Sequence, residues 1–221
     1  MIRLFTLALI TCLMPLSTWA QPVQEVKSDE TPQVRVEVII FQSLALRGWT
    51  EEYWPDIYEL PQIENVRYFN ATDGYARLLP QEQLTLNNDV AKMTTEKGYD
   101  VLAHFGWQQP TLPKDQAEPV LIDQSVQQSR MESSILFGTI RFYQERFAHI
   151  EVDIELDRQI PERIRDDFAR HQQIDADWMT EGWRFQLKES RRIRPGELHY
   201  LDHPIFGVLV KFERVESKPK S

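Results

Sequence analysis

Residues 135–156 read ILFGTIRFYQERFAHIEVDIEL, and this stretch sets the architecture of the chain. It contains two apolar runs, at 135–143 and 147–156, and the second alternates apolar with polar residues. Alternation with a period of two is typical of half-buried β-strands. Only residues 144–146 separate the two runs, and a connection this short predicts an antiparallel hairpin.

Segments with related patterns lie on both sides of this hairpin. In the first of them, valine and isoleucine alternate with Arg35 and Glu37. We expect further strands at 34–40, 99–108, 183–193 and 206–214.

Two segments have weaker helical spacing. The first covers 86–93, with Asn87 as its cap and Gly98 as its left-handed stop. The second begins at Pro161 and continues through Phe168. Together with the strands, these segments predict an α+β domain in which a few short helices accompany a mostly antiparallel sheet.

The first 20 residues have the layout of a secretory signal peptide. Arg3 precedes an apolar run at 4–16, and small residues lead to Ala20, after which we expect cleavage. This run is too short to cross a bilayer, which takes roughly 20 apolar residues. The sequence therefore predicts an exported protein rather than one held by a membrane helix.

Cys12 is the only cysteine of the chain, and it lies in this apolar run. The threonine before it fits a lipoprotein acylation site poorly, so a signal peptide is the stronger interpretation. The remaining chain would then have no thiol for a disulfide, for catalysis or for a metal. We expect a polar, flexible leader at 21–33, one domain at 34–215 and a frayed tail at 216–221.

The net charge limits the classes of partner. The whole chain has 25 Lys and Arg against 34 Asp and Glu, and removal of Arg3 with the signal peptide changes the net charge from −9 to −10. This acidity argues against nucleic acid or anionic lipid as a main partner.

The strand at 183–193 has a basic outer row that runs on to Arg194. Arginine binds carboxylates through two parallel hydrogen bonds, so one interpretation is carboxylate recognition. The strand at 149–157 has an acidic row, and cross-strand ion pairing is the alternative. We favour pairing for Arg184 and Lys188, and leave both interpretations open for Arg192 and Arg194.

The following turn has two histidines, His199 and His203, on either side of Asp202. Their spacing resembles metal-binding pairs, but Pro204 disfavours a helix that would present both rings on one face. We therefore expect histidines that anchor a corner between two strands. Glu189 and Arg191 fall on the core-facing parity of their strand, and we expect a structural ion pair there.

The segment HFGWQQP at 104–110 ends a strand with an aromatic residue, two amides and a proline. Trp107 could stack on a sugar ring while Gln109 bonds its hydroxyls, although such a tryptophan usually belongs to the core. Trp49 and Trp54 are similarly ambiguous. The chain has no nucleophile elbow, no phosphate-binding glycine loop and no evident acid/base pair, so an enzyme is disfavoured and we expect no cofactor.

Three segments together resemble one family. They are VEVIIF at 36–41, YDVLAHFGWQQP at 99–110 and RRIRPGELHYLDHP at 191–204, and the resemblance is to the CsiV family. It covers nearly the whole chain after the signal peptide, and the third string is distinctive. The segment at 111–132 is less typical of the family.

This resemblance implies a periplasmic protein of Gram-negative bacteria that binds peptidoglycan and supports cell-wall assembly and cell shape. It also implies a partner, an outer-membrane lipoprotein that activates a bifunctional peptidoglycan synthase. The family motifs fall on a set of positions that are not established ligands: His104, Trp107, Gln109, Pro110, Arg191, Arg192, Glu197, His199, Tyr200, Leu201, Asp202, His203, Pro204 and Gly207.

The leading hypothesis is a non-enzymatic protein that binds peptidoglycan, whose stem peptides offer carboxylates and whose glycan offers N-acetyl sugars. Its candidate ligand-binding residues are Arg192, Arg194, Trp107, Gln109, His199, Tyr200 and Asp202. One alternative is a docking factor for the synthase activator, in which wall binding is incidental. Another is a metal-dependent periplasmic hydrolase built on His199 and His203.

Overall fold

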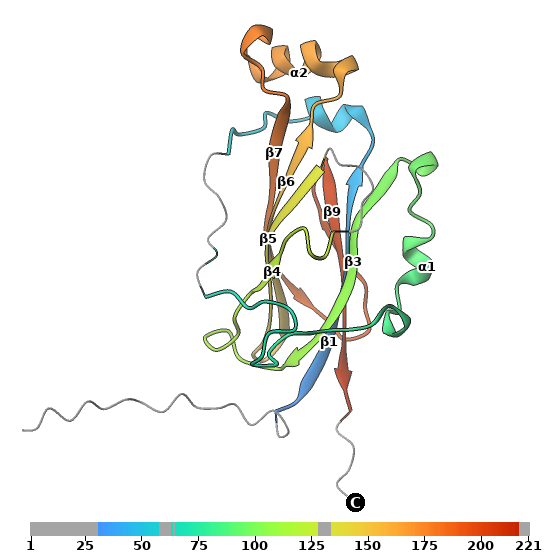
Figure 1. Cartoon of the computed structure of the whole chain (residues 1–221), viewed down its shortest axis with the longest axis vertical. Coiled ribbons are helices and arrows are strands. Elements are labelled where there is room, and N and C mark those ends of the chain that lie inside the picture. The colour runs from blue at the N-terminus through green and yellow to red at the C-terminus, as the bar shows by residue number, and fades with distance from the viewer. Residues whose placement is uncertain (1–30, 58–62, 64, 128–133, 217–221) are drawn as a thin grey trace, which may run out of the picture.

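The computed structural model describes residues 31–57, 63, 65–127 and 134–216 (Figure 1). The expected signal peptide lies outside the described residues, as do most of the leader and residues 217–221 of the tail. Within the described part, no helix is long and apolar enough to cross a membrane.

The strands form two antiparallel sheets. The larger sheet has the order β2-β3-β1-β9-β8, and the smaller has the order β4-β5-β6-β7. In the larger sheet the strands are β2 (Arg77–Leu78), β3 (Tyr99–Pro110), β1 (Gln33–Ser43), β9 (Phe206–Val215) and β8 (His199–Asp202). In the smaller sheet they are β4 (Val120–Ile122), β5 (Ser134–Gln144), β6 (Ala148–Gln159) and β7 (Gly182–Ile193).

The helical elements are short. The α-helices are α1 (Asn87–Val90) and α2 (Arg165–Gln172). The 3-10 turns are η1 (Leu46–Thr50), η2 (Gln81–Gln83), η3 (Thr95–Lys97), η4 (Glu162–Ile164) and η5 (Ala176–Trp178). The α+β class and the β5–β6 hairpin are therefore confirmed. The first helix prediction was too long, because α1 has only four residues. The second was placed too early, because 3-10 turn η4 occupies 162–164 and α2 runs from Arg165 to Gln172.

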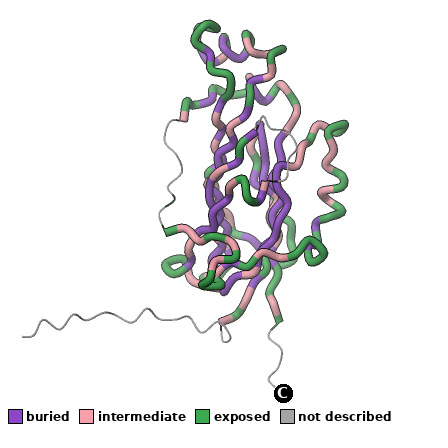
Figure 2. Tube along the Cα trace, in the orientation of Figure 1, coloured by how far each residue is buried: buried purple, intermediate pink, exposed green. Residues whose placement is uncertain are grey.

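The two sheets pack face to face around one continuous core (Figure 2). Inward side chains of both sheets contribute to it, and the rings of Phe142 on β5 and Phe212 on β9 lie 5.0 Å apart between their centroids. Figure 1 shows α2 at one end of this sandwich. Since β7 pairs with β6 from Gly182 to Ile193, β7 runs from the α2 end to the turn of the β5–β6 hairpin.

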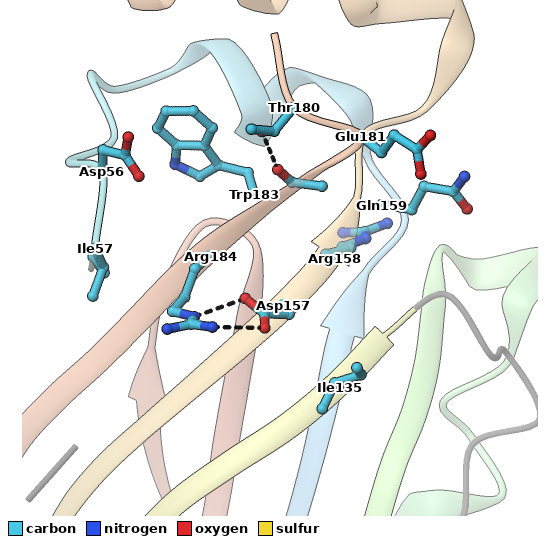
Figure 3. Close-up of a pocket in the computed structure, with 11 residues that line it drawn as sticks. Asp56, Ile57, Ile135, Asp157, Arg158, Gln159, Thr180, Glu181, Trp183 and Arg184 are labelled. Carbon is cyan, nitrogen blue, oxygen red and sulfur yellow. Dashed lines mark hydrogen bonds and ion pairs between the residues drawn. The ribbon is translucent and has the colours of Figure 1, made fainter. Parts of the chain in front are cut away.

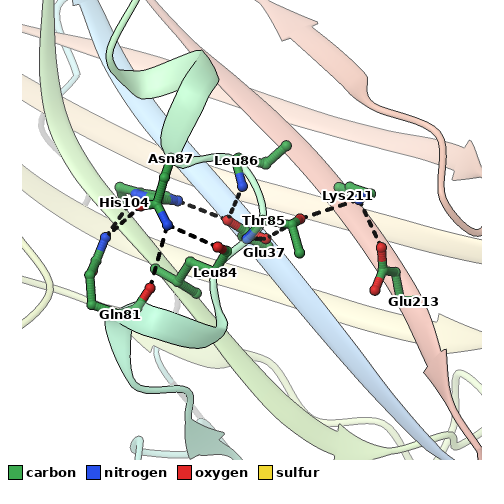
Figure 4. Close-up of polar contacts among 9 residues, drawn as sticks. All are labelled: Glu37, Gln81, Leu84, Thr85, Leu86, Asn87, His104, Lys211 and Glu213. Carbon is green, nitrogen blue, oxygen red and sulfur yellow. Dashed lines mark hydrogen bonds and ion pairs between the residues drawn. The ribbon is translucent and has the colours of Figure 1, made fainter.

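The outer face of the larger sheet carries a buried polar network (Figure 4). The Glu37 carboxylate accepts hydrogen bonds from the backbone N–H groups of Thr85 and Leu86, from the Thr85 hydroxyl, and contacts His104 Nε2 at 2.9 Å. Burial alone would raise the pKa of Glu37, but these hydrogen bonds outweigh it and lower the pKa to about 2. The network fixes the segment around α1 onto β1 and β3.

Candidate functional site

Acidic residues of β6 pair with the basic row of β7 along most of its length. Arg184 lies opposite Asp157, and its Nε and Nη2 donate to the two carboxylate oxygens at 2.8 and 3.0 Å. Lys188 lies opposite Asp153, with 2.7 Å between Nζ and Oδ2. The pairing expected for Arg184 and Lys188 is confirmed, so neither is available as a simple carboxylate receptor.

Arg191 holds the edges of the two sheets together. Its Nη2 lies 2.7 Å from Glu189 Oε1, and its Nη1 donates to the backbone carbonyl of Tyr200 on β8. Both charged side chains are half-buried, as expected for a structural pair. Arg191 therefore acts in the fold, as expected from its position on the core-facing side of its strand.

The acidic row of β6 ends before Arg192, which lies opposite His149. The Arg192 guanidinium lies over the ring of Phe147, 3.3 Å from its centroid, and Arg146 lies 5.2 Å from the same centroid. Phe147 is 37% exposed at the turn of the hairpin, so its ring supports both cations at the surface. Stacking on an aromatic ring orients a guanidinium without neutralising its charge.

A small concavity of about 210 Å³ lies beside this stack, and we call it the arginine pocket. Four exposed arginines line it, from the hairpin turn, the end of β7, the segment after it and the end of β9. The lining residues are Gln144, Arg146, Phe147, Ala148, Arg192, Ile193, Arg194, Pro195, Phe212 and Arg214.

The cations of the arginine pocket have little counter-charge. Among the described residues, no carboxylate lies within ion-pair distance of Arg146, Arg192 or Arg214. Arg194 has one contact, 3.5 Å from Glu197, between two mostly exposed side chains, and a pair of this kind contributes little. In a chain of net charge −9, the arginine pocket is therefore a local concentration of positive charge.

The two histidines anchor the corner between β7 and β9. His199 Nε2 accepts a hydrogen bond from the Arg194 backbone N–H at 3.0 Å, which fixes the turn that carries Arg194. His203 Nδ1 accepts from the Ile205 N–H at 3.2 Å, and its ring packs against Trp54 and Phe206. Burial lowers the pKa of His203 to about 4, so the ring is neutral. In the described part of the chain, no group of three His, Cys, Asp or Glu could hold a metal.

Tyr200 and Asp202 bond to each other instead of lining the arginine pocket. The Tyr200 hydroxyl donates to Asp202 Oδ1, and its ring stacks on Phe41 of the larger sheet at 5.9 Å between centroids. Gly207 leaves room for this ring, because a Cβ there would lie 2.6 Å from Tyr200 Cε2. Burial and the hydrogen bond to Asp202 raise the pKa of Tyr200, which keeps the hydroxyl protonated.

The positions of Trp107 and Gln109 contradict their assignment as sugar contacts. Trp107 has no exposed surface and Gln109 is 1% exposed, because both side chains point between the sheets. The Trp107 indole donates to Gln109 Oε1 at 2.7 Å, and Gln109 Nε2 donates to the carbonyl of Phe142 at 3.3 Å. The amide therefore satisfies an indole and a carbonyl inside the core. Trp49 and Trp54 are buried as well.

Sequence reasoning missed three residues of the arginine pocket: Arg146, Phe147 and Arg214. Arg146 ends the predicted hairpin turn and Phe147 begins the strand after it, and a cation next to an aromatic residue at this position was the available signal. Arg214 had no such signal, because its place depends on how β9 packs beside the smaller sheet. Arg192 and Arg194 do come together as expected.

Comparison with known proteins supports one family. The family model described as peptidoglycan-binding protein, CsiV, matches residues 4–215 of this chain. No curated protein and no solved structure matches the chain. The matched range contains every strand and helix of the sandwich and all four arginines of the pocket. The chain belongs to the CsiV family of peptidoglycan-binding proteins.

Proposed function

We propose that this protein is a non-enzymatic, periplasmic accessory of cell-wall assembly and cell shape, and that its arginine pocket binds carboxylates of peptidoglycan stem peptides. The observation that carries the proposal is the convergence of four exposed arginines, three of which have no carboxylate within ion-pair distance among the described residues. The membership in a family of peptidoglycan-binding proteins supports the polymer as the ligand.

The geometry suits a carboxylate. Guanidinium groups present paired N–H donors that match its two oxygens, and hydrogen bonds of this charged kind contribute about 1.5–3 kcal/mol each. Long-range attraction is absent, because both the chain and the wall polymer are acidic. Binding therefore depends on local contacts in the arginine pocket. The signal-peptide layout of residues 1–20 supports the periplasm as the compartment.

Co-sedimentation with isolated sacculi tests the proposal. Wild-type protein should pellet with sacculi at low salt, and Arg192→Ala should pellet markedly less. Arg163→Ala is the matched control, because Arg163 is an exposed arginine of η4, outside the arginine pocket. Thermal melts of each variant separate lost binding from lost folding. Wild-type protein that stays in the supernatant would overturn the proposal.

A second candidate function is docking to a protein partner, for which the outer-membrane lipoprotein that activates a synthase is the candidate implied by family resemblance. The observation that favours docking is Trp178 on η5, which is 82% exposed. Arg165 donates to the carbonyls of Met179 and Thr180, so the turn that presents this indole is fixed. Exposed tryptophans on rigid turns are frequent anchors of protein interfaces. Trp178→Ala should abolish capture of the activator and leave sacculus binding unchanged.

A further inference from the structure

A second concave site lies at the opposite end of β7 from the arginine pocket. Figure 3 shows this second site in close-up. It is a cleft of about 600 Å³, a volume within the usual range for small-molecule sites. Four segments form it: the chain after η1, the start of β5, the end of β6 and the start of β7. The lining residues are Asp56, Ile57, Ile135, Asp157, Arg158, Gln159, Thr180, Glu181, Gly182, Trp183 and Arg184. We call it the tryptophan cleft.

The indole of Trp183 gives this cleft an unused hydrogen-bond donor. Trp183 is 6% exposed, and its Nε1 is buried with no hydrogen-bond partner among the described residues. Figure 3 shows the indole projecting toward the segment that carries Asp56 and Ile57. A buried donor without a partner costs roughly 1–3 kcal/mol, so a ligand that supplies an acceptor recovers this cost.

Both arginines of the cleft are already engaged by other groups of the protein, so the cleft does not favour an anion. Arg184 is held by two hydrogen bonds to Asp157, and Arg158 Nη1 donates to the carbonyl of Ser43 at 2.6 Å. The lining contains three acids, Asp56, Asp157 and Glu181, against these two arginines. In contrast to the arginine pocket, the surroundings favour a ligand without net charge.

Apolar side chains lie beside these polar groups. Ile135 is 46% exposed at the start of β5, and Ile57 lies across the cleft from it. Gln159 and Thr180 add neutral polar groups at the rim. A fitting ligand therefore combines a carbonyl acceptor for the indole, a methyl group for the isoleucines and hydroxyls for the rim. An N-acetylated sugar carries all three groups on one ring.

We propose that the tryptophan cleft binds an N-acetylhexosamine unit, whose acetamido carbonyl accepts from Trp183 Nε1 and whose methyl group packs against Ile57 and Ile135. This inference rests on the proposed function, because it assigns the glycan of the same polymer to a second site. Trp183 and Ile193 are ten residues apart on β7, so at about 3.3 Å per residue the two sites lie about 33 Å apart. Stem peptide and glycan would thus contact different ends of one strand.

The test uses chitotriose, the trisaccharide of N-acetylglucosamine, as the probe and cellotriose as its matched control, since cellotriose has hydroxyls in place of the acetamido groups. The readout is the indole N–H resonance of Trp183 in purified, isotope-labelled protein, assigned by its disappearance in Trp183→Phe. Chitotriose at millimolar concentration should shift this resonance progressively, and cellotriose should not. Equal shifts with both sugars, or no shift with chitotriose, would overturn the inference.

A second test of the tryptophan cleft uses a substitution outside the hydrophobic core. Ile135→Asp changes a half-exposed side chain, so the fold should persist while a charge replaces the apolar contact for the methyl group. The affinity for chitotriose should fall about tenfold, which corresponds to about 1.4 kcal/mol. Undiminished affinity would contradict the assignment.

Sacculus co-sedimentation separates this inference from the proposed function. If wild-type protein pellets with sacculi and chitotriose leaves Trp183 unshifted, the cleft assignment fails and the proposed function stands. If chitotriose binds and sacculi do not retain the protein, the cleft assignment stands and the proposed function fails.

Discussion

The two ends of β7 are built from the same strand and have opposite chemistry. At the α2 end, Arg184 is neutralised by Asp157 of the neighbouring strand, and the cleft beside it is nearly balanced in charge. At the hairpin end, Arg192 faces His149 and stacks on Phe147, so its charge remains available. An arginine on a sheet therefore keeps its charge available where the facing strand has no acidic residue opposite it.

The largest expected effect comes from a substitution that disrupts the smaller sheet and so abolishes both the arginine pocket and the tryptophan cleft. Gly138 on β5 has φ of +151°, and a Cβ there would lie 2.2 Å from the carbonyl oxygen of Asp153 on β6. Gly138→Val should therefore separate the hairpin strands and lower the free energy of unfolding by about 4 kcal/mol or more. Chemical denaturation measures this change. A variant with wild-type stability would show that the close approach of β5 and β6 is dispensable.

The second-largest effect on stability is expected from Glu37, which lies on β1 of the larger sheet. Because the pKa of Glu37 is about 2 in the folded protein, against 4.5 ordinarily, its ionised form stabilises the fold above pH 4.5. This contribution, on the order of 3 kcal/mol, is lost as the pH falls from about 4.5 toward 2. Glu37→Gln should be less stable at neutral pH and should lose this part of the pH dependence.

The Glu37 prediction is checked by thermal melts of both proteins between pH 2 and pH 7. Both ligand sites should weaken only as far as the protein unfolds, since Glu37 lies in neither of them. Parallel pH profiles for wild type and variant would contradict the role assigned to the buried carboxylate.

The third effect is a loss of binding at the arginine pocket that leaves the tryptophan cleft unchanged. Replacing Arg146 and Arg192 together by alanine should reduce the affinity for sacculi about ten- to a hundredfold, which corresponds to about 1.5–3 kcal/mol. The affinity for chitotriose at the tryptophan cleft should stay unchanged. Titrations of both ligands with the double variant measure this. A parallel loss at both ends would mean that they form one site or that the fold has been damaged.

The smallest effect is expected midway along β7. Lys188 pairs with Asp153, but its side chain is 72% exposed, and exposed pairs contribute about 0–1 kcal/mol. Lys188→Ala should therefore barely move the melting temperature and should leave both ligand affinities intact. A large loss of sacculus binding would show that the basic row acts as a whole and that the ends are not distinct.

Much of the fold follows from local pattern. The period-two alternation at 147–156 and the short link before it give the hairpin, and the facing acidic and basic rows give the pairs of Arg184 and Lys188. That the strands divide into two sheets depends on contacts between distant segments, which alternation does not encode.

The candidate site was predictable only in part for the same reason. Arg192 and Arg194 follow from their place beyond the acidic row, but Arg214 reaches the pocket through the packing of the two sheets. Trp107 lies two residues after Phe105 on β3, so the two side chains point to the same face of the sheet. Because Phe105 also enters the core, this shared face was the signal against a surface role for Trp107. The amide of Gln109 is buried because it hydrogen-bonds to the Trp107 indole and to the Phe142 carbonyl. The sequence alone does not show these two partners.

Co-sedimentation of wild-type protein with sacculi, before and after chemical amidation of their carboxylates, tests directly whether the arginine pocket binds stem-peptide carboxylates. Amidation removes the negative charge that the arginine pocket is proposed to recognise and leaves the glycan intact. Most of the binding should disappear after amidation, and Arg163→Ala should behave like wild type. Equal binding to native and amidated sacculi would contradict it.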